Sequence, residues 1–184
     1  VATQRGETEH FSVSDHLSAF DGLPTRKKLE MLSHERGLPR GLHGFLNELK
    51  QQYTTDQVHT ACRPTFVHEY ALSNLKAQGY KLGLASNSVR NSVELMMEKS
   101  ALRPYLDVMV SNEDVSKPKP DPDMYLTATR LLGVAPENTL VVEDNPNGIK
   151  AAEDAGCHLL VVHSVFDVKL DAIRSAIDRV EAQT

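Results

Sequence analysis

The feature that most constrains the fold is an alternation of short apolar segments with longer amphipathic segments, which runs from residue 64 to the end of the chain. The apolar segments lack polar residues at every second position, as in strands whose two faces are both covered. Strands are predicted over 81–85, 108–111, 139–142 and 158–163. Helices are predicted over 66–78, 91–102, 123–132, 148–155 and 170–182. This pattern indicates the α/β class, with a doubly wound parallel sheet.

The first third of the chain has a different character, because its apolar residues recur at helical spacing and form no convincing strand. Short helices are predicted over 13–20, 25–36, 42–53 and 55–61. We therefore expect two parts, an α-helical domain over 1–63 and an α/β domain over 64–184.

Polar side chains follow the first predicted strand, where Ser86, Asn87 and Ser88 come directly after an apolar run. A hydroxyl group and the backbone N–H groups of a turn at this position can hold an anion. The alternative is that Ser88 or Asn91 only caps the helix that follows.

A proline-rich loop, residues 116–124, follows the second predicted strand and carries Lys117 and Lys119. Proline fixes φ and restricts the residue before it, so the loop holds its lysines in place. A lysine held there can neutralise a phosphate or a carboxylate. The alternative is a rigid connection whose lysines point into water.

Two adjacent carboxylates, Glu143 and Asp144, follow the third predicted strand. Ligands of open α/β sheets bind at the carboxyl ends of the strands, and Mg²⁺ is commonly held by one or two carboxylates together with phosphate and water oxygens. The alternative is a helix N-cap followed by a first-turn acid, which the helix dipole favours. The three strand ends together indicate phosphate chemistry with Mg²⁺ as cofactor.

The composition and charge of the chain limit the kinds of molecule that it is expected to bind. The net charge is −5 and no basic stripe is present, so nucleic acid is not an expected partner. No run of residues is long and apolar enough to predict a membrane span. Cys62 and Cys157 are far apart in the sequence, which favours a reduced, cytoplasmic setting. The sequence leaves the oligomeric state open.

At these motifs the chain resembles the haloacid dehalogenase superfamily, in particular the subgroup of β-phosphoglucomutase and small sugar-phosphate phosphatases. The resemblance implies a Rossmann-like core with a helical cap, and a small phosphorylated substrate. It assigns phosphate binding to Ser86 with Asn87, stabilisation of the phosphate and the nucleophile to Lys119, and Mg²⁺ binding to Glu143 and Asp144. Lys117 remains the alternative to Lys119, because it also begins a Lys-Pro-x-Pro-Asp run.

The helical first third resembles the cap of this subgroup. Residues 20–29 are similar to the cap loop that faces the substrate, so Thr25 and Arg26 become candidates for substrate binding. An arginine suits a phosphate because its planar group can bind two oxygens at once. The alternative is that Arg26 is a solvated residue in the first turn of a helix.

One family motif is missing. Members begin with a buried strand that ends in Asp-x-Asp, where the first Asp is the nucleophile, and no such strand occurs before residue 64. The resemblance places that strand centrally, between the strands predicted over 81–85 and 139–142. Its absence would leave two interior edges with unpaired N–H and C=O groups, so we expect the chain to be part of a longer protein and inactive alone.

The resemblance predicts a Mg²⁺-dependent phosphomonoester hydrolase that forms an aspartyl-phosphate. The alternatives are a β-phosphoglucomutase-like phosphomutase and a non-catalytic relative that binds phosphate or Mg²⁺. A receiver-like signalling domain also combines acids, a hydroxyl and a lysine, but it carries no helical cap.

Overall fold

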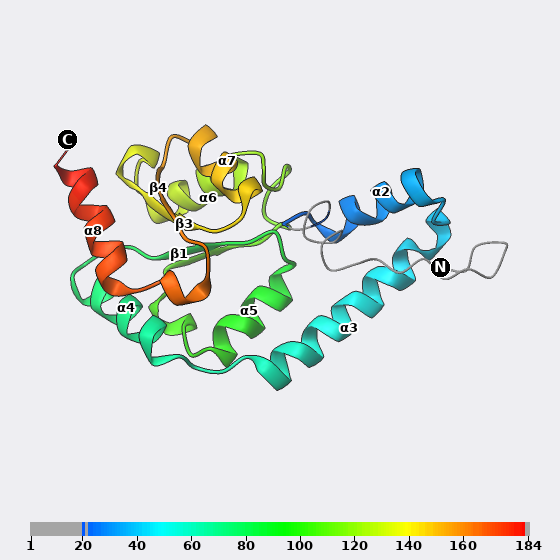
Figure 1. Cartoon of the computed structure of the whole chain (residues 1–184), viewed down its shortest axis with the longest axis horizontal. Coiled ribbons are helices and arrows are strands. Elements are labelled where there is room, and N and C mark those ends of the chain that lie inside the picture. The colour runs from blue at the N-terminus through cyan, green and yellow to red at the C-terminus, as the bar shows by residue number, and fades with distance from the viewer. Residues whose placement is uncertain (1–19, 21, 183–184) are drawn as a thin grey trace.

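The computed structural model describes residue 20 and residues 22–182, and it opens with a helical arm (Figure 1). The arm consists of α2 (Thr25–Arg36), η1 (Arg40–Leu42) and α3 (His43–Ala61). The helix predicted over 13–20 lies outside the described residues, apart from its last position.

The division of α3 into two helices, over 42–53 and 55–61, was wrong. α3 is continuous from His43 to Ala61. The hydroxyl of Thr54 donates to the carbonyl oxygen of Lys50 at 2.9 Å, so its hydrogen bond is made within the helix and Thr54 does not cap a second one.

The predicted alternation of strands and helices is confirmed. After the arm, the elements are α4 (Phe66–Ala77), β1 (Gly83–Ala85), α5 (Arg90–Lys99), η2 (Arg103–Tyr105), β2 (Val108–Val110), α6 (Asp123–Leu132), η3 (Pro136–Asn138), β3 (Leu140–Glu143), α7 (Pro146–Asp154), β4 (His158–Val161), η4 (Val165–Asp167) and α8 (Leu170–Glu181). Helix α6 has the predicted bounds, and the other elements differ from the prediction by a few residues at their ends.

The strands form two separate parallel pairs within the part of the chain that the structure describes. β1 pairs with β2, and β3 pairs with β4. Parallel pairing is expected where helices connect consecutive strands. The predicted central strand would lie between β1 and β3, where no described strand joins the two pairs.

No strand of the described residues pairs with the edges of β1 and β3 that face away from their partners. Asp107 N–H donates to the carbonyl of Leu82 at 2.8 Å, so the backbone of Leu82 is directed toward β2. Because the N–H and C=O groups of successive residues point to opposite sides of a strand, those of Gly83 and Ala85 point away from β2. His158 N–H donates to the carbonyl of Thr139 in the same way, which leaves 140 and 142 directed away from β4.

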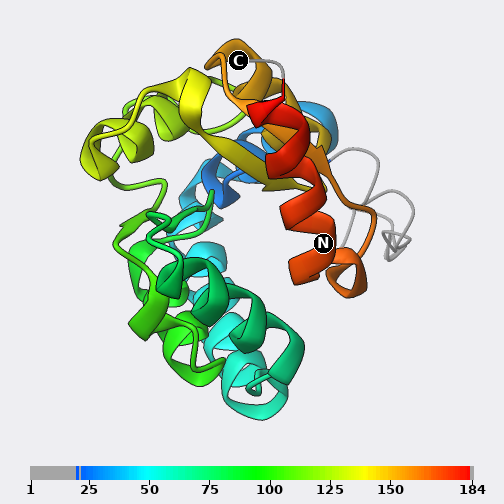
Figure 2. The same ribbon diagram turned by 90° about the vertical axis from the view of Figure 1, so that its left-hand side faces the viewer.

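Helices bridge the two strand pairs on both faces. On one face, α4 and α8 share an apolar cluster that takes in Leu82 beside β1 and Leu140 from β3. On the other face, Tyr125 of α6 packs with Val141 of β3 and with Ala85 of β1. Figure 1 shows α6 and α7 above the strands, and Figure 2 shows α8 beside β3 and β4. These helices hold the four carboxyl strand ends in one region although the sheet is divided.

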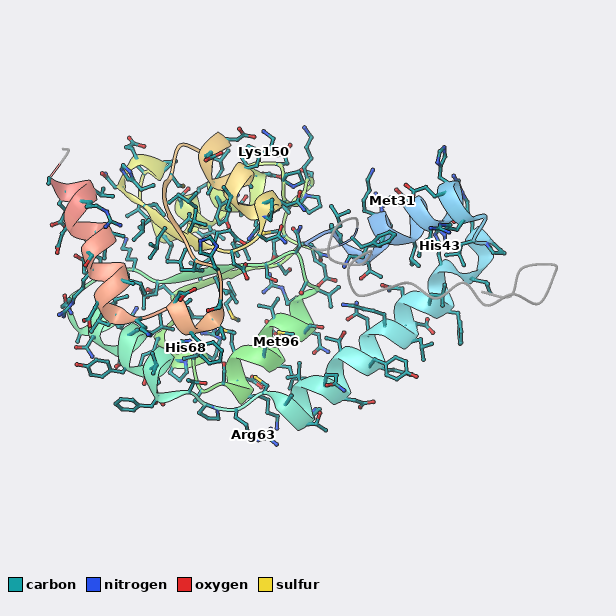
Figure 3. All side chains as sticks on the ribbon, viewed as in Figure 1. Met31, His43, Arg63, His68, Met96 and Lys150 are labelled. Atoms are coloured by element: carbon teal, nitrogen blue, oxygen red, sulfur yellow. The ribbon has the colours of Figure 1, made fainter. Side chains whose placement is uncertain are left out.

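The arm is attached to the α/β unit through α3, which packs on α5. The side chain of Gln51 accepts a hydrogen bond from the buried Ser92 of α5 at 3.3 Å. Within the arm, the Ser33 hydroxyl lies 2.7 Å from Nε2 of His43, which joins α2 to α3 (Figure 3). None of the helices described is long and apolar enough to cross a bilayer.

Candidate phosphate-binding site

A cavity of about 410 Å³ lies where the carboxyl ends of β1 and β3 meet the arm. The α/β unit contributes Ser86, Lys119 and Glu143 to its lining, and the arm contributes Thr25. Three segments that are distant in sequence therefore deliver the predicted hydroxyl, lysine and carboxylate to one cavity. Its volume is in the range of small-molecule sites.

Ser86 stands at the end of β1 and does not cap the following helix. Its N–H donates to the carbonyl of Val110 at 2.9 Å, which continues the β1–β2 pairing and fixes its backbone. Its hydroxyl oxygen accepts from the N–H of Ser88 at 3.2 Å. The N-cap of α5 is Val89, without a side-chain cap, so neither Ser88 nor Asn91 has the alternative role. The Ser86 hydroxyl lines the cavity, where it can meet an anion.

Lys119 is the buried lysine of the proline-rich loop. Its Nζ donates to Oε2 of Glu143 at 2.9 Å and to the hydroxyl of Tyr125 at 2.9 Å. The Tyr125 hydroxyl also donates to Oε2 of Glu143, at 2.7 Å. The lysine is 7% exposed. This triad of Lys119, Tyr125 and Glu143 fixes a positive charge beside the cavity.

Lys117, the alternative lysine, is placed differently. Its side chain is 74% exposed and forms a surface ion pair with Asp121 at 3.7 Å. Such exposed pairs contribute little to stability. Lys117 does not line the cavity, so the solvated interpretation of the loop holds for Lys117 and not for Lys119.

The triad keeps Glu143 charged. Burial by itself raises the pKa of a carboxyl group, but the charge of Lys119 and the hydrogen bonds from Tyr125 and Lys119 bring the pKa of Glu143 below its ordinary value. Burial raises the pKa of Tyr125, and the Glu143 carboxylate that it faces raises that pKa further. The tyrosine therefore remains a neutral donor at neutral pH.

Residues at the start of α7 also confine the carboxylate of Glu143. Its Oε1 accepts from the N–H of Asn145 at 3.2 Å. A Cβ atom at Gly148 would lie 2.5 Å from both carboxylate oxygens, so only glycine leaves room for this carboxylate. Asn145 caps α7 by accepting from the N–H of Asn147, so neither Glu143 nor Asp144 is the cap. Asp144 is exposed just beyond β3 and does not line the cavity.

The Asn87 side chain holds the lysine loop. Its Oδ1 accepts from the N–H of Lys119 at 3.0 Å, and its Nδ2 donates to the carbonyl of Lys119 at 3.1 Å. Nδ2 also donates to the carbonyl of Gly22 at 2.7 Å, which ties the start of the arm to the site. Asn87, which was predicted to bind substrate, also lines the cavity, so its amide both borders the site and holds the backbone of Lys119.

The two arm residues that were predicted for substrate binding are separated. Thr25 lines the cavity, whereas the Arg26 side chain is 89% exposed and pairs with Glu30 at 3.5 Å on the outer surface of α2. Sequence reasoning did not identify Lys28 and Lys50, which also line the cavity. Lys28 lies in the 20–29 segment that resembles the substrate-facing cap loop, whereas Lys50 lies on a polar stretch of helix and belongs to no motif, so only the packing of the arm reveals it.

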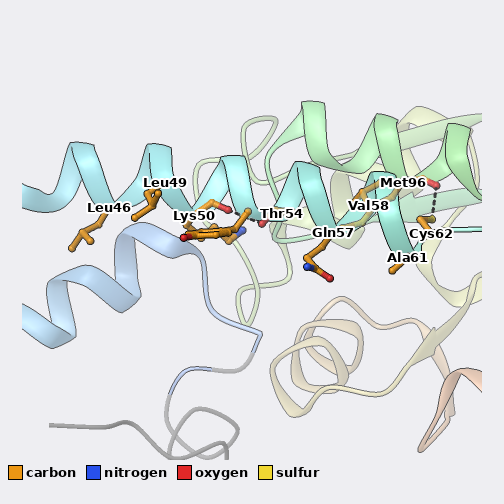
Figure 4. Close-up of a pocket in the computed structure, with 10 residues that line it drawn as sticks. Leu46, Leu49, Lys50, Thr54, Gln57, Val58, Ala61, Cys62 and Met96 are labelled. Atoms are coloured by element: carbon orange, nitrogen blue, oxygen red, sulfur yellow. Dashed lines mark hydrogen bonds between the residues drawn. The ribbon is translucent and has the colours of Figure 1, made fainter. Parts of the chain in front are cut away.

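A second, larger cavity of about 710 Å³ lies along α3 (Figure 4). It is lined mainly by apolar side chains such as Leu46, Leu49 and Val58 of α3 and Met96 of α5. It brings together no set of groups suited to catalysis, and the cavity at the strand ends remains the candidate site.

Comparisons with known proteins agree with this geometry. A profile of the family described as haloacid dehalogenase-like hydrolase matches residues 6–162. A phosphorylated carbohydrates phosphatase of Thermotoga maritima is 31% identical over 150 residues, which cover 80% of this chain and 69% of that protein. Pyrophosphatase PpaX of Bacillus cereus is 35% identical over 114 residues, which cover 62% of this chain and 47% of that protein.

The fold has a counterpart among solved structures. A β-phosphoglucomutase from Clostridium difficile superposes with a TM-score of 0.72 at 20% identity, over 88% of this chain and 80% of that one. The chain spans about half to two thirds of the length of the curated relatives that it matches.

Proposed function

Because this chain belongs to the haloacid dehalogenase-like hydrolase family, we propose that it forms most of a phosphatase that acts on a small phosphorylated metabolite. The observation that carries this proposal is the triad of Lys119, Tyr125 and Glu143, of which Lys119 and Glu143 line the same cavity as Ser86. The phosphatase names of two relatives support it.

The nucleophile in this proposal is an aspartate outside the chain. No described strand lies between β1 and β3, and helices pack on both faces of the two pairs, so a strand inserted between them would gain partners on both edges. In parallel orientation its carboxyl end would lie between Ser86 and Glu143. An Asp at that end would attack phosphorus in line and form an aspartyl-phosphate, while the P–O bond to the substrate's alcohol breaks and the alcohol leaves. Water would then hydrolyse the aspartyl-phosphate and release inorganic phosphate. Without the strand we expect no turnover.

The chain's own residues hold the phosphoryl group. The Ser86 hydroxyl donates to one phosphoryl oxygen, and Lys119 balances the charge that develops on the others. Glu143 and Tyr125 keep the Lys119 ammonium group in place, and the Asn87 amide fixes the backbone of that lysine. Little reorganisation is then needed when the substrate enters.

Glu143 and Asp144 together provide the number of carboxylates that a Mg²⁺ site needs, since this ion commonly takes one or two protein carboxylates. Both oxygens of Glu143 already accept hydrogen bonds, so Asp144 would hold the ion directly, with Glu143 assisting. When bound, Mg²⁺ supplies positive charge against the phosphoryl oxygens. Asp144 is exposed at the strand end, directly after Glu143.

A second candidate function is phosphate binding without catalysis. It is favoured by one observation: among the residues described, no strand ending in Asp-x-Asp joins β1 to β3. The two candidates differ in whether a nucleophile is ever supplied.

Cys62 and Cys157 are both free thiols, which supports the cytoplasmic setting that we include in the proposal.

The test is phosphate release from a panel of sugar phosphates, with MgCl₂ or with EDTA, using the protein joined to the Asp-bearing strand. We expect Mg²⁺-dependent release that falls at least about 100-fold in the Lys119→Met and Asp144→Asn variants. Lys117→Met is the matched control, because it removes the same charge from the same loop, and it should retain activity. Equal activity in the Lys119→Met and Lys117→Met variants would contradict the assignment.

A further inference from the structure

The turn that carries Ser86 is held by a residue that follows the neighbouring strand, β2. Asn112 donates from Nδ2 to the carbonyl of Asn87 at 2.9 Å, and its backbone N–H donates to the carbonyl of Ser88 at 3.2 Å. One residue therefore holds two consecutive carbonyl groups of the turn. Asn112 is half-buried and lines the cavity at the strand ends together with Ser86.

Asn112 is itself fixed by the loop to which it belongs. The N–H and the hydroxyl of the buried Ser111 both donate to Oδ2 of Asp114 at 2.7 Å. The N–H of Glu113 donates to the hydroxyl of Ser111 at 3.3 Å, and the carboxylate of Glu113 accepts from the N–H of Arg90 at 2.6 Å. These bonds tie the loop to the first turn of α5, so they fix the backbone from which the Asn112 side chain reaches the turn.

The bond from Asn112 determines which way the peptide group between Asn87 and Ser88 points. This peptide is trans, so its N–H points opposite to its C=O, and a carbonyl held toward Asn112 directs the N–H of Ser88 the other way. That N–H donates to the hydroxyl oxygen of Ser86 at 3.2 Å. Among the residues that the structure describes, the Ser86 hydroxyl donates to none. It therefore accepts from the protein and keeps its own hydrogen for a group in the cavity.

These hydrogen bonds run in one direction, from the Asn112 amide through the peptide group to Ser86. Bonds in such a chain polarise one another, so that each strengthens the next. A peptide group that accepts at its carbonyl oxygen is a better donor at its N–H, and a hydroxyl that accepts from that N–H becomes a better donor in turn. The acceptor that profits most at the end of the chain is an anion.

We propose that Asn112 is a positioning residue for phosphate binding, which acts through the peptide group after Asn87 to hold the Ser86 hydroxyl as a donor to a phosphoryl oxygen. The inference rests on the proposed function, because that function assigns the phosphoryl group to Ser86 and Lys119. The competing role is purely structural, in which Asn112 stabilises the loop and has no effect that depends on Ser86.

Asn91 provides a matched comparison. It lies near the start of α5, it is exposed, and it does not line the cavity. Asn91→Ala removes the same amide from a neighbouring part of the chain, and it should leave phosphate binding unchanged. For Asn112 two replacements are compared, because Asn112→Ala removes the amide together with its volume and Asn112→Leu removes the amide while nearly keeping that volume.

The experiment is isothermal titration of inorganic phosphate, with MgCl₂ present, into the full 184-residue chain. Each variant is made in the wild-type and in the Ser86→Ala background, which gives a double-mutant cycle. In the wild-type background both Asn112 replacements should weaken phosphate binding about three- to tenfold, the effect of losing one hydrogen bond. In the Ser86→Ala background, where Lys119 still binds phosphate, they should weaken it less than about twofold, because the group through which Asn112 acts is gone.

The inference is overturned if both Asn112 replacements weaken binding by the same factor in the two backgrounds, if they leave it unchanged in the wild-type background, or if Asn91→Ala has the same effect. Unfolding of both Asn112 variants, seen by circular dichroism, also overturns it, because the residue would then serve the fold. In these cases phosphate binding by the wild-type chain leaves the proposed function standing. Absence of phosphate binding by the wild-type chain would overturn both.

Discussion

Replacement of Gly148 by alanine tests how firmly the Glu143 carboxylate is held. The new Cβ would lie 2.5 Å from both carboxylate oxygens, whereas ordinary contacts of a Cβ atom begin near 3.4 Å. The carboxylate must therefore move by roughly an ångström, since carbon and oxygen cannot interpenetrate at close packing. Movement of that size breaks its hydrogen bonds with Lys119 and Tyr125, which are 2.9 and 2.7 Å long.

The expected loss of stability follows from three contributions. Alanine at a helical position gains up to about 1 kcal/mol over glycine. Overpacking costs about 1–3 kcal/mol. Disruption of a buried ion pair costs up to about 3–5 kcal/mol, and only part of this applies because both partners remain. The net expectation is a destabilisation of about 2–4 kcal/mol in Gly148→Ala.

The assay is urea denaturation followed by circular dichroism at neutral pH. Gly44→Ala is the matched control, because Gly44 is also helical and its Cβ would meet no atom within 4 Å. The control should lose no more than about 0.5 kcal/mol. If Gly148→Ala and Gly44→Ala unfold at the same urea concentration, the carboxylate is not confined as described and the reasoning fails.

Three further predictions concern neighbouring residues. Lys119→Met should cost about 3–5 kcal/mol at pH 7. In the folded wild type the pKa of Glu143 is lowered, so the stability that this carboxylate contributes is present above its unfolded pKa and is lost as pH falls. In Lys119→Met, burial without the lysine raises that pKa, so the loss of unfolding free energy relative to wild type should be smaller at pH 4 than at pH 7 in urea melts. An equal loss at both pH values would contradict the pairing of Lys119 with Glu143. Asn87→Ala should cost about 1–3 kcal/mol and weaken phosphate binding, because both backbone bonds to Lys119 are lost; unchanged phosphate affinity by titration would argue against a positioning role. Gly22→Ala should be more destabilising than Gly37→Ala in thermal melts. Both glycines have φ near +70°, but only at Gly22 would a Cβ atom meet a neighbour, the side-chain amide carbon of Asn145 at 2.7 Å.

The strand-end chemistry of this protein could be predicted from the sequence because parallel strands place their carboxyl ends at one edge. That rule predicts that Ser86, Lys119 and Glu143 lie together, and the structure places all three on one cavity. The separation of the described strands into two pairs could also be expected, because the family resemblance places a strand between them and the sequence predicts no such strand before residue 64.

Other features depend on tertiary packing and carry no local signal. Lys117 and Lys119 occur in the same Lys-Pro-x-Pro-Asp pattern, and only burial against Tyr125 and Glu143 separates them. Lys50 lies on a polar stretch of helix, which by itself predicts a solvated surface residue. Only the packing of the arm beside the strand ends shows that Lys50 lines the cavity. The split of α3 was predicted from local composition, which gave no account of Thr54 bonding back to its own helix.

The most direct test of the central claim is to map the binding of inorganic phosphate and MgCl₂ on the isotope-labelled chain by NMR. The site described here predicts that the largest amide shifts occur at 86–88, at Lys119 and at 143–148, and that Lys119→Met abolishes them while Lys117→Met does not. Shifts scattered over other surfaces, or shifts that persist unchanged in Lys119→Met, would contradict a single oxyanion site at the ends of β1 and β3.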